Sequence, residues 1–328
     1  MPFRVLATWV LCLAFAGLSF PGVARGIQDH APTTDAHVVA AGELQIGPVV
    51  TEEDHLASRT VVDRGTGATF KVFFDPISEP VARAKIPMLA AFYRRVADLV
   101  AVDPARVAWD SVLFARNAEE LLLTRKEGLT QWRVDVAADG QPSEAGIKTL
   151  YQVVPHEQVH ATQDIGHGPM GLARWFAEGQ ATWAGLQVTD EWRPDLAGEE
   201  RARRAAELAA SKQPLALGQW GGVHPKREAI LRQLTPEQRA QFEKNPSSVQ
   251  LSGTFRFGPD DFLQDESNSP ARYGASLALF ERIDARAGRA AVLDWFRAVQ
   301  QAGPKVDSNR IATLVSDATG IDIKHDLQ

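Results

Sequence analysis

Cysteine is almost absent from this chain. The only cysteine among the 328 residues is Cys12, close to the N-terminus. A chain with a single cysteine can form no internal disulfide and cannot supply two thiolates to a metal site. Removal of the N-terminal segment would exclude a cysteine nucleophile as well. Any transition metal must then be held by histidine, aspartate or glutamate side chains.

Long hydrophobic runs are absent too, with one exception at the N-terminus. Residues 5–20 carry no charge, follow Arg4 and precede the small residues Gly22-Val23-Ala24. A charged start, an apolar centre and a small-residue exit are typical of a secretory signal peptide, and the run is shorter than the ~20 residues of a membrane-spanning helix. We therefore expect a signal peptide over 1–24, cleaved near Ala24, with an uncleaved membrane anchor as the alternative. The mature protein is then secreted or periplasmic and has no stable membrane anchor.

Charge of one sign does not dominate the chain. The formal net charge is −6, with 23% charged and 45% hydrophobic residues. This composition is that of a folded protein rather than a disordered one. Because basic residues are not in excess, nucleic acid is not an expected partner. The length allows one large domain or two lobes that share a cleft.

The pattern along the chain predicts an α+β protein. Residues 25–57 are polar and weakly patterned, which favours a loosely ordered leader or linker. Strands are expected at 69–74, 107–114 and 131–136, helices at 80–100, 144–164, 171–188, 198–212, 236–244, 269–287, 289–302 and 308–318, and a helix or turn at 226–234. Residues 189–198 and 245–268 are expected to be loops. The expected architecture is a lobe with a small mixed sheet over 58–190 and a helical lobe over 191–328.

One short motif carries metal-binding chemistry, His156-Glu157-Gln158-Val159-His160. On a helix, side chains four positions apart lie on one face, so His156 and His160 can meet at a single point. Two imidazoles suit zinc, and Glu157 beside them could take a proton from a water molecule that the metal activates. The alternative is a solvated helix face with two surface histidines. Apolar neighbours argue for a buried helix, in which two histidines need partners.

A third ligand is expected from the next helix. Glu178 is the one carboxylate in the apolar stretch Trp175-Phe176-Ala177-Glu178-Gly179. A second helix packed beside the first could deliver this carboxylate and leave a fourth metal position open. The alternative is a surface glutamate on an ordinary helix.

The two stretches together resemble the gluzincin zinc peptidases of the peptidase MA-like group, whose second helix reads roughly W-[LF]-x-E-G. The resemblance implies a zincin-like fold, with two zinc-site helices beside the small sheet and a helical C-terminal lobe. It implies one Zn²⁺ per chain on His156, His160 and Glu178, with Glu157 as general base. Residues 269–276 resemble the tyrosine-led helix of these proteins. Tyr273 would then donate a hydrogen bond to the oxyanion of the tetrahedral intermediate, unless it is a core tyrosine.

His167 is the rival third ligand. A metzincin pattern requires glycine at position 163 and histidine at position 166, whereas this chain has Gln163 and Gly166. The register is wrong by one position, which favours Glu178.

Two further residues bear on the geometry of the motif. Asp164 lies one turn beyond His160 and could orient a zinc-bound imidazole, or it could simply form a turn. Pro155 directly precedes the motif. Inside a helix it would remove a backbone hydrogen bond and kink the axis, but it would suit a helix that starts again at this residue.

These observations predict a zinc-dependent peptidase that acts on a peptide or protein substrate. No motif for a free substrate N-terminus is evident, which favours an endopeptidase. The alternatives are a non-catalytic secreted binding protein on the same fold and a zinc hydrolase of a non-peptide substrate. The strand at 131–136 either lies at the sheet edge and pairs with an extended substrate, or is an ordinary strand of the sheet.

Overall fold

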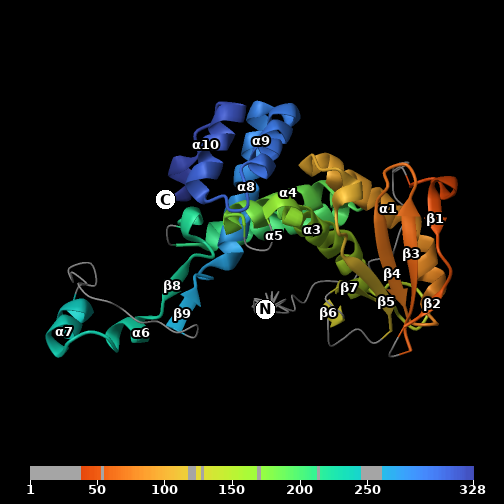
Figure 1. Cartoon of the computed structure of the whole chain (residues 1–328), viewed down its shortest axis with the longest axis horizontal. Coiled ribbons are helices and arrows are strands. Elements are labelled where there is room, and N and C mark those ends of the chain that lie inside the picture. The colour runs from red at the N-terminus through yellow and green to blue at the C-terminus, as the bar shows by residue number, and fades with distance from the viewer. Residues whose placement is uncertain are drawn as a thin grey trace, which may run out of the picture.

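The computed structural model describes residues 38–52, 55–116, 123–126, 129–167, 171–212, 215–244 and 261–328. The predicted signal peptide and residues 25–37 of the predicted leader lie outside these ranges. None of the described helices combines the length and apolarity that crossing a bilayer requires. The described residues form an α+β structure with a mixed sheet and mostly helices (Figure 1).

The sheet has seven strands. They are β1 (Leu44–Ile46), β2 (Val50–Thr51), β3 (Ala57–Asp63), β4 (Thr69–Phe74), β5 (Ser111–Ala115), β6 (Leu123–Lys126) and β7 (Leu129–Asp135). Their order is β1-β3-β4-β5-β7-β6, and β2 also pairs with β3. Strands β4, β5 and β7 run parallel, and the other pairs are antiparallel. Every residue of β5 is buried, as expected for a central parallel strand covered on both faces.

One expectation about the sheet is wrong. Residues 44–51 are not loosely ordered, because β1 and β2 pair with β3. Strands this short carry too few residues to show an alternating pattern. Strand β7 lies between β5 and β6, and its pairing with β6 covers residues 129–132. The interpretation as an ordinary internal strand holds for 131–132, whereas 133–135 pair with β5 alone among the described residues.

The helices fill most of the remaining described chain. Helix α1 (Glu79–Val100) connects the parallel strands β4 and β5, and its predicted apolar stripe is buried. The others are α2 (Glu144–Lys148), α3 (Val154–His167), α4 (Arg174–Trp192), α5 (Pro194–Ala210), α6 (Arg227–Leu231), α7 (Pro236–Lys244), α8 (Ser269–Ala287), α9 (Arg289–Gln301) and α10 (Ser308–Thr319). Two short strands, β8 (Val223–Pro225) and β9 (Phe262–Gln264), pair with each other.

The predicted loop at 189–198 is wrong. Helix α4 continues to Trp192 and α5 begins at Pro194, so Arg193 alone separates them. Trp192 and Leu196 are both buried, and this packing favours helix on either side of the junction. Pro194 suits the first turn of α5 because that turn needs no donor from its backbone nitrogen.

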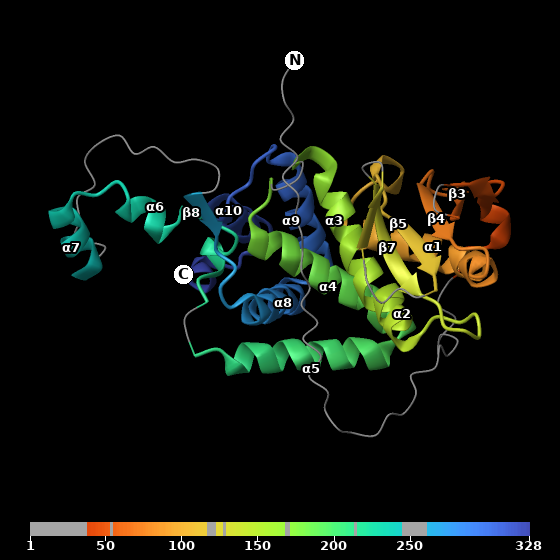
Figure 2. The same ribbon diagram turned by 90° about the horizontal axis from the view of Figure 1, so that it is seen from below.

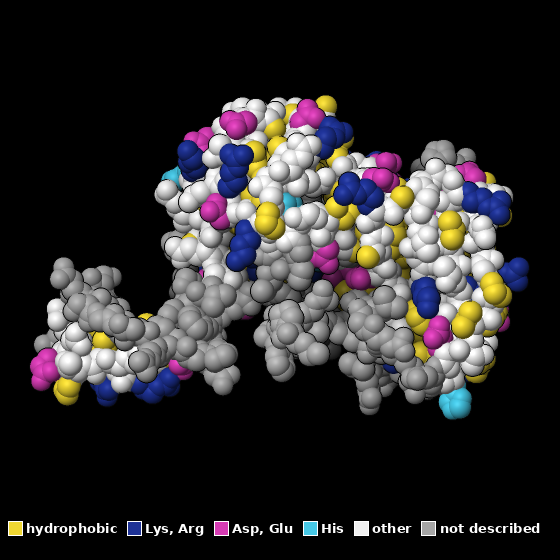
Figure 3. All heavy atoms as spheres, viewed as in Figure 1, with side chains coloured by type: hydrophobic (Ala, Val, Ile, Leu, Met, Phe, Trp, Pro, Cys, Tyr) yellow, Lys and Arg dark blue, Asp and Glu magenta, His cyan; other side chains and the backbone are white. Residues whose placement is uncertain are grey.

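Helices α3 and α4 lie between the sheet and the helices α8 to α10 (Figure 1). Helix α5 runs alongside α4 and α8 (Figure 2). An aromatic cluster ties α4 to α8 and α9, with ring centroids 5.1 to 6.4 Å apart, and consists of Trp175, Phe176, Trp183, Phe280, Trp295 and Phe296. On the face shown in Figure 3, the basic and acidic side chains of the described residues are interspersed.

Candidate metal centre

Helices α3 and α4 approach each other closely at the motif. A Cβ atom at Gly185 of α4 would lie 2.9 Å from the Cα of His156, a separation that real Cβ atoms almost never show. Because glycine has no Cβ atom, Gly185 lets the backbones of α3 and α4 come this close. Because the two backbones are so close, side chains from both helices can reach one point.

Pro155 is accommodated at the start of α3. Since proline has no N–H, the carbonyl of Tyr151 loses the donor that an α-helix would provide. The hydroxyl of Thr189 on α4 donates to this carbonyl at 2.6 Å. A π-helical turn at Thr149–Val153 directly precedes α3. The backbone stays helical at Lys148, Thr149 and Val154, so the helix does not start again at Pro155. Pro155 lies inside a continuous helix whose π-helical turn accommodates it, and the motif remains helical.

Three predicted ligand atoms come together between α3 and α4. The Nε2 atoms of His156 and His160 are 3.2 Å apart, and Oε2 of Glu178 lies 3.6 and 3.5 Å from them, respectively. Zinc in tetrahedral coordination, with bonds of about 2.0–2.1 Å, separates its ligand atoms by roughly 3.3 Å. The three observed distances bracket this value. The geometry therefore fits a single metal ion with three protein ligands.

The burial of Glu178 also fits a cation. Its side chain is 7% exposed, and Oε2 has no hydrogen-bond partner among the described residues. The imidazole nitrogens of His156 and His160 face this oxygen at 3.6 and 3.5 Å, so the buried carboxylate is compensated by a protonated imidazole or by a cation that all three side chains share. Two imidazoles and one carboxylate suit zinc and also other divalent transition metals.

Without metal, the three side chains hold a proton among themselves. Burial favours a neutral imidazole, yet the Glu178 carboxylate outweighs this effect and raises the pKa of His160 to about 10. Burial lowers the pKa of His156. Burial alone would raise the pKa of Glu178, but the two imidazoles hold it well below its usual value. A metal ion must displace the shared proton, so its apparent affinity falls as the pH falls.

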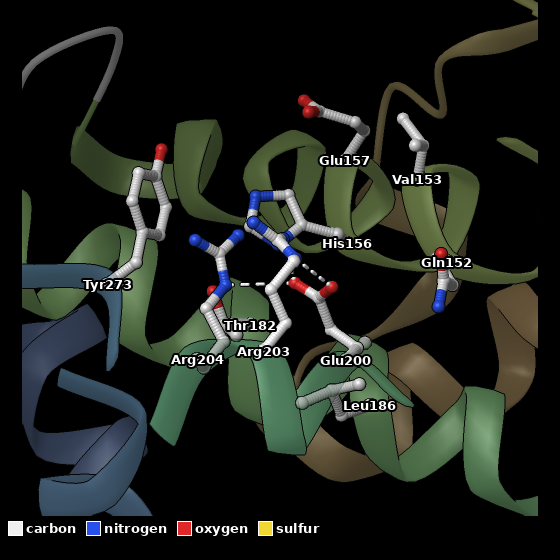
Figure 4. Close-up of a pocket in the computed structure, with 11 residues that line it drawn as sticks. Gln152, Val153, His156, Glu157, Thr182, Leu186, Glu200, Arg203, Arg204 and Tyr273 are labelled. Atoms are coloured by element: carbon white, nitrogen blue, oxygen red, sulfur yellow. Dashed lines mark hydrogen bonds and ion pairs between the residues drawn. The ribbon is translucent and has the colours of Figure 1, made fainter. Parts of the chain in front are cut away.

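Glu157 lies beside the three ligands on α3 and lines a cavity together with His156 (Figure 4). Its side chain is 6% exposed, and Oε1 has no hydrogen-bond partner among the described residues. Burial, with a smaller contribution from the neighbouring carboxylates, raises the pKa of Glu157 to about 8. A carboxylate with a pKa near neutrality can both accept and release a proton.

The imidazole of His160 is oriented by Gln163 and not by Asp164. Nδ1 of His160 lies 2.8 Å from Oε1 of Gln163, whose Nε2 donates to the carbonyl of Ala177 and to Oε1 of Gln180, both at 2.9 Å. Because the amide nitrogen faces these two acceptors, Oε1 accepts from Nδ1–H, and Nε2 of His160 faces the metal position. Asp164 is exposed. Helical spacing puts both Gln163 and Asp164 about one turn after His160 and does not distinguish them.

We expect Gln163→Ala to weaken zinc binding by about 10- to 100-fold, because the imidazole loses its orienting hydrogen bond. Competition against a chromophoric chelator measures this affinity. Asp164→Ala, one position further along the same helix, is the control and should bind zinc as the parent does. Equal losses in both variants would contradict the assignment of Gln163.

Tyr273 on α8 lies beside the motif. It lines the same cavity as His156 and Glu157. Burial and the Glu178 carboxylate raise the pKa of Tyr273 well above its usual value, so its hydroxyl stays protonated and can donate. The Tyr273 ring packs edge-on against Trp220, with centroids 4.9 Å apart. The structure thus brings the predicted Tyr273 together with the predicted ligands.

His167 is separate from the metal centre. Its Nδ1 lies 2.6 Å from the carbonyl oxygen of Gly303, and its side chain is buried. The group of potential ligands within reach of one ion consists of His156, His160 and Glu178. The helical part of α3 ends before Ile165, and Gly166 adopts a φ of 86°, in agreement with the predicted break. His167 therefore points elsewhere, and the alternative third ligand is not supported.

The cavity beside the motif has a wall that the sequence did not indicate. It has a volume of about 60 Å³, and α5 contributes Glu200, Arg203 and Arg204 to its lining (Figure 4). Arg174 was also missed: its Nε lies 3.8 Å from Oε1 of Glu178, and it forms an ion pair with Glu266. The residues of α5 are distant in sequence from the motif, so no local spacing predicts their place in the cavity. Arg174 lies four positions before Glu178 on α4, and helical spacing could have indicated this contact.

No protein-family model matches this sequence, and no curated protein has a significantly similar sequence.

Proposed function

We propose that this protein is a zinc-dependent peptidase of the gluzincin type. His156, His160 and Glu178 hold one Zn²⁺, and Glu157 is the general base. The observation that carries the proposal is the set of ligand distances of 3.2 to 3.6 Å beside a buried carboxylate with an unpartnered oxygen. The pairing of two metal-site helices with a mixed sheet supports the further proposal of a zincin-like fold in the peptidase MA-like group.

The proposed reaction uses groups that already face the site. A bound zinc ion supplies a Lewis acid that polarises the scissile carbonyl and acidifies water. Glu157 takes a proton from the attacking water and passes it to the amide nitrogen as the C–N bond breaks. The water oxygen remains on the carbonyl carbon as part of the new carboxylate. Tyr273 donates a hydrogen bond to the carbonyl oxygen, where negative charge develops.

A buried Glu157 favours an enzyme over a binding protein. A binding protein would need the three ligands but not a fourth, unpartnered acidic group beside them. Burying this carboxyl group is unfavourable, which argues for a chemical role. A zinc hydrolase of a non-peptide substrate would use the same groups. Only a test of substrates distinguishes it from a peptidase.

The proposal is tested by incubating residues 25–328 with a defined peptide mixture and identifying the products by mass spectrometry. We expect cleavage that stops when a chelator removes the metal and returns when zinc is added. Hydrolysis of esters or other small acyl compounds but of no peptide would favour a non-peptide hydrolase. No hydrolysis of any substrate by the zinc-loaded protein would favour a binding protein.

A further inference from the structure

The cavity beside His156 contains a fixed guanidinium group. Arg204 on α5 lines the cavity and is 8% exposed. A Cβ atom at Gly274 of α8 would lie 2.4 Å from the backbone oxygen of Arg204, so the glycine permits the close approach of α5 and α8. The Arg204 guanidinium stacks over the ring of Tyr273 at 4.5 Å from its centroid. Packing therefore holds Arg204 next to the proposed oxyanion residue.

Two glutamates use only part of the hydrogen-bonding capacity of Arg204. Its Nε donates to Oε1 of Glu200 at 2.8 Å, and its Nη1 donates to Oε2 of Glu207 at 3.2 Å. Nη2 donates to no described residue. The neighbouring Arg203 differs, because its Nε, Nη1 and Nη2 all donate to the same two glutamates. Nη2 of Arg204 is thus a charged donor that remains for a ligand.

The surroundings of Nη2 suit a small anionic group. Figure 4 shows the Arg204 guanidinium between Tyr273 and His156, directed toward the cavity. A cavity of about 60 Å³ has room for roughly four water-sized groups. A carboxylate is small enough to enter this space. Guanidinium groups bind carboxylates through short, charge-assisted hydrogen bonds.

We infer that Arg204 binds a carboxylate of the substrate close to the scissile bond. This inference rests on the proposed peptidase function. The carboxylate can come from the C-terminus of the substrate or from an acidic side chain beside the cleaved bond. In the first case cleavage occurs next to the substrate C-terminus, in contrast to the endopeptidase action that the sequence favoured.

Three peptides test the inference: a free acid, its C-terminal amide, and the same amide with its last residue replaced by aspartate. For the zinc-loaded parent we expect kcat/KM to be at least about 10-fold higher for the free acid than for the amide, since a charge-assisted hydrogen bond is lost in the amide. If the aspartyl amide is cleaved as fast as the free acid, an acidic side chain can supply the carboxylate that Arg204 binds. Equal kcat/KM values for all three peptides would overturn the inference.

The variant Arg204→Gln should bring the ratio of free acid to amide close to one. Arg201→Gln is the matched control, because Arg201 lies on α5, forms ion pairs with Asp190 and Glu281, and does not line the cavity. The control should keep the parental ratio. If Arg204→Gln fails to fold, Arg204→Lys replaces it in the experiment. The ratio of kcat/KM for the free acid to that for the amide should then fall, because the lysine ammonium group does not reach the position of Nη2. An unchanged ratio in a folded Arg204 variant would refute the inference.

Affinity gives a readout that is independent of turnover. Calorimetric titration of the three peptides into the zinc-loaded protein should show tighter binding of the free acid in the parent and not in Arg204→Gln. If no peptide is hydrolysed, the proposed function fails while this titration still decides whether Arg204 binds a carboxylate. If peptides are hydrolysed without any preference, the peptidase proposal stands and the role of Arg204 is wrong.

Discussion

Glu157→Gln should lower kcat by about 1,000-fold while the zinc content stays at the parental level, because a general base typically contributes 10²- to 10⁴-fold to rate. Glutamine has nearly the same shape as glutamate, so the packing around this buried position is preserved. The amide cannot accept a proton from water at neutral pH. The three metal ligands are untouched by this change, so binding and turnover are separated.

The measurement is kcat on any peptide that the parent cleaves, together with zinc content by elemental analysis. Glu144→Gln is the control for the same chemical change, because Glu144 is an exposed residue of α2 that pairs with Lys148. It should leave both quantities unchanged. A Glu157→Gln variant that keeps more than about a tenth of the parental kcat would contradict the mechanism.

Glu178→Ala is expected to weaken zinc binding more than Gln163→Ala does. Loss of a residue that only orients a ligand weakens metal binding by roughly 10- to 100-fold, whereas Glu178→Ala removes a ligand itself. The variant leaves two imidazoles and removes the only charged ligand of the three. Hydrolysis should be lost in parallel, because the same ion activates the substrate. Competition with a chelator of known affinity measures the change.

His167→Ala is the control for this experiment. His167 is buried and lies 2.6 Å from the Gly303 carbonyl oxygen, so its loss should affect the free energy of unfolding and leave zinc affinity unchanged. Retention of parental zinc affinity by Glu178→Ala, together with its loss in His167→Ala, would assign the third ligand to His167 instead.

The parts of the site that the sequence predicted depend on local helical geometry. A spacing of four on one helix places His156 and His160 on one face in any context. Local capping was equally predictable: the Ser143 side chain accepts from the backbone nitrogen of Gly146. The reciprocal hydrogen bonds of Thr235 and Gln238 likewise confirm the predicted start of α7.

The parts that were missed depend on packing between distant segments. Positions 163 and 164 both lie about one turn after His160, and only the placement of α4, with Ala177 and Gln180, selects Gln163. Arg204 reaches the cavity because Gly274 allows α5 to approach α8. The short strand β1 similarly exists through its pairing with β3. Local sequence patterns do not predict such contacts, because they form only when distant segments pack together in the tertiary structure.

The central claim is that three side chains bind one zinc ion, and anomalous diffraction from crystals grown with zinc tests it most directly. Data on both sides of the zinc absorption edge should show one peak about 2.0–2.2 Å from Nε2 of His156, Nε2 of His160 and a carboxylate oxygen of Glu178. A peak elsewhere, or no peak at these residues when zinc is supplied in excess, would contradict the account.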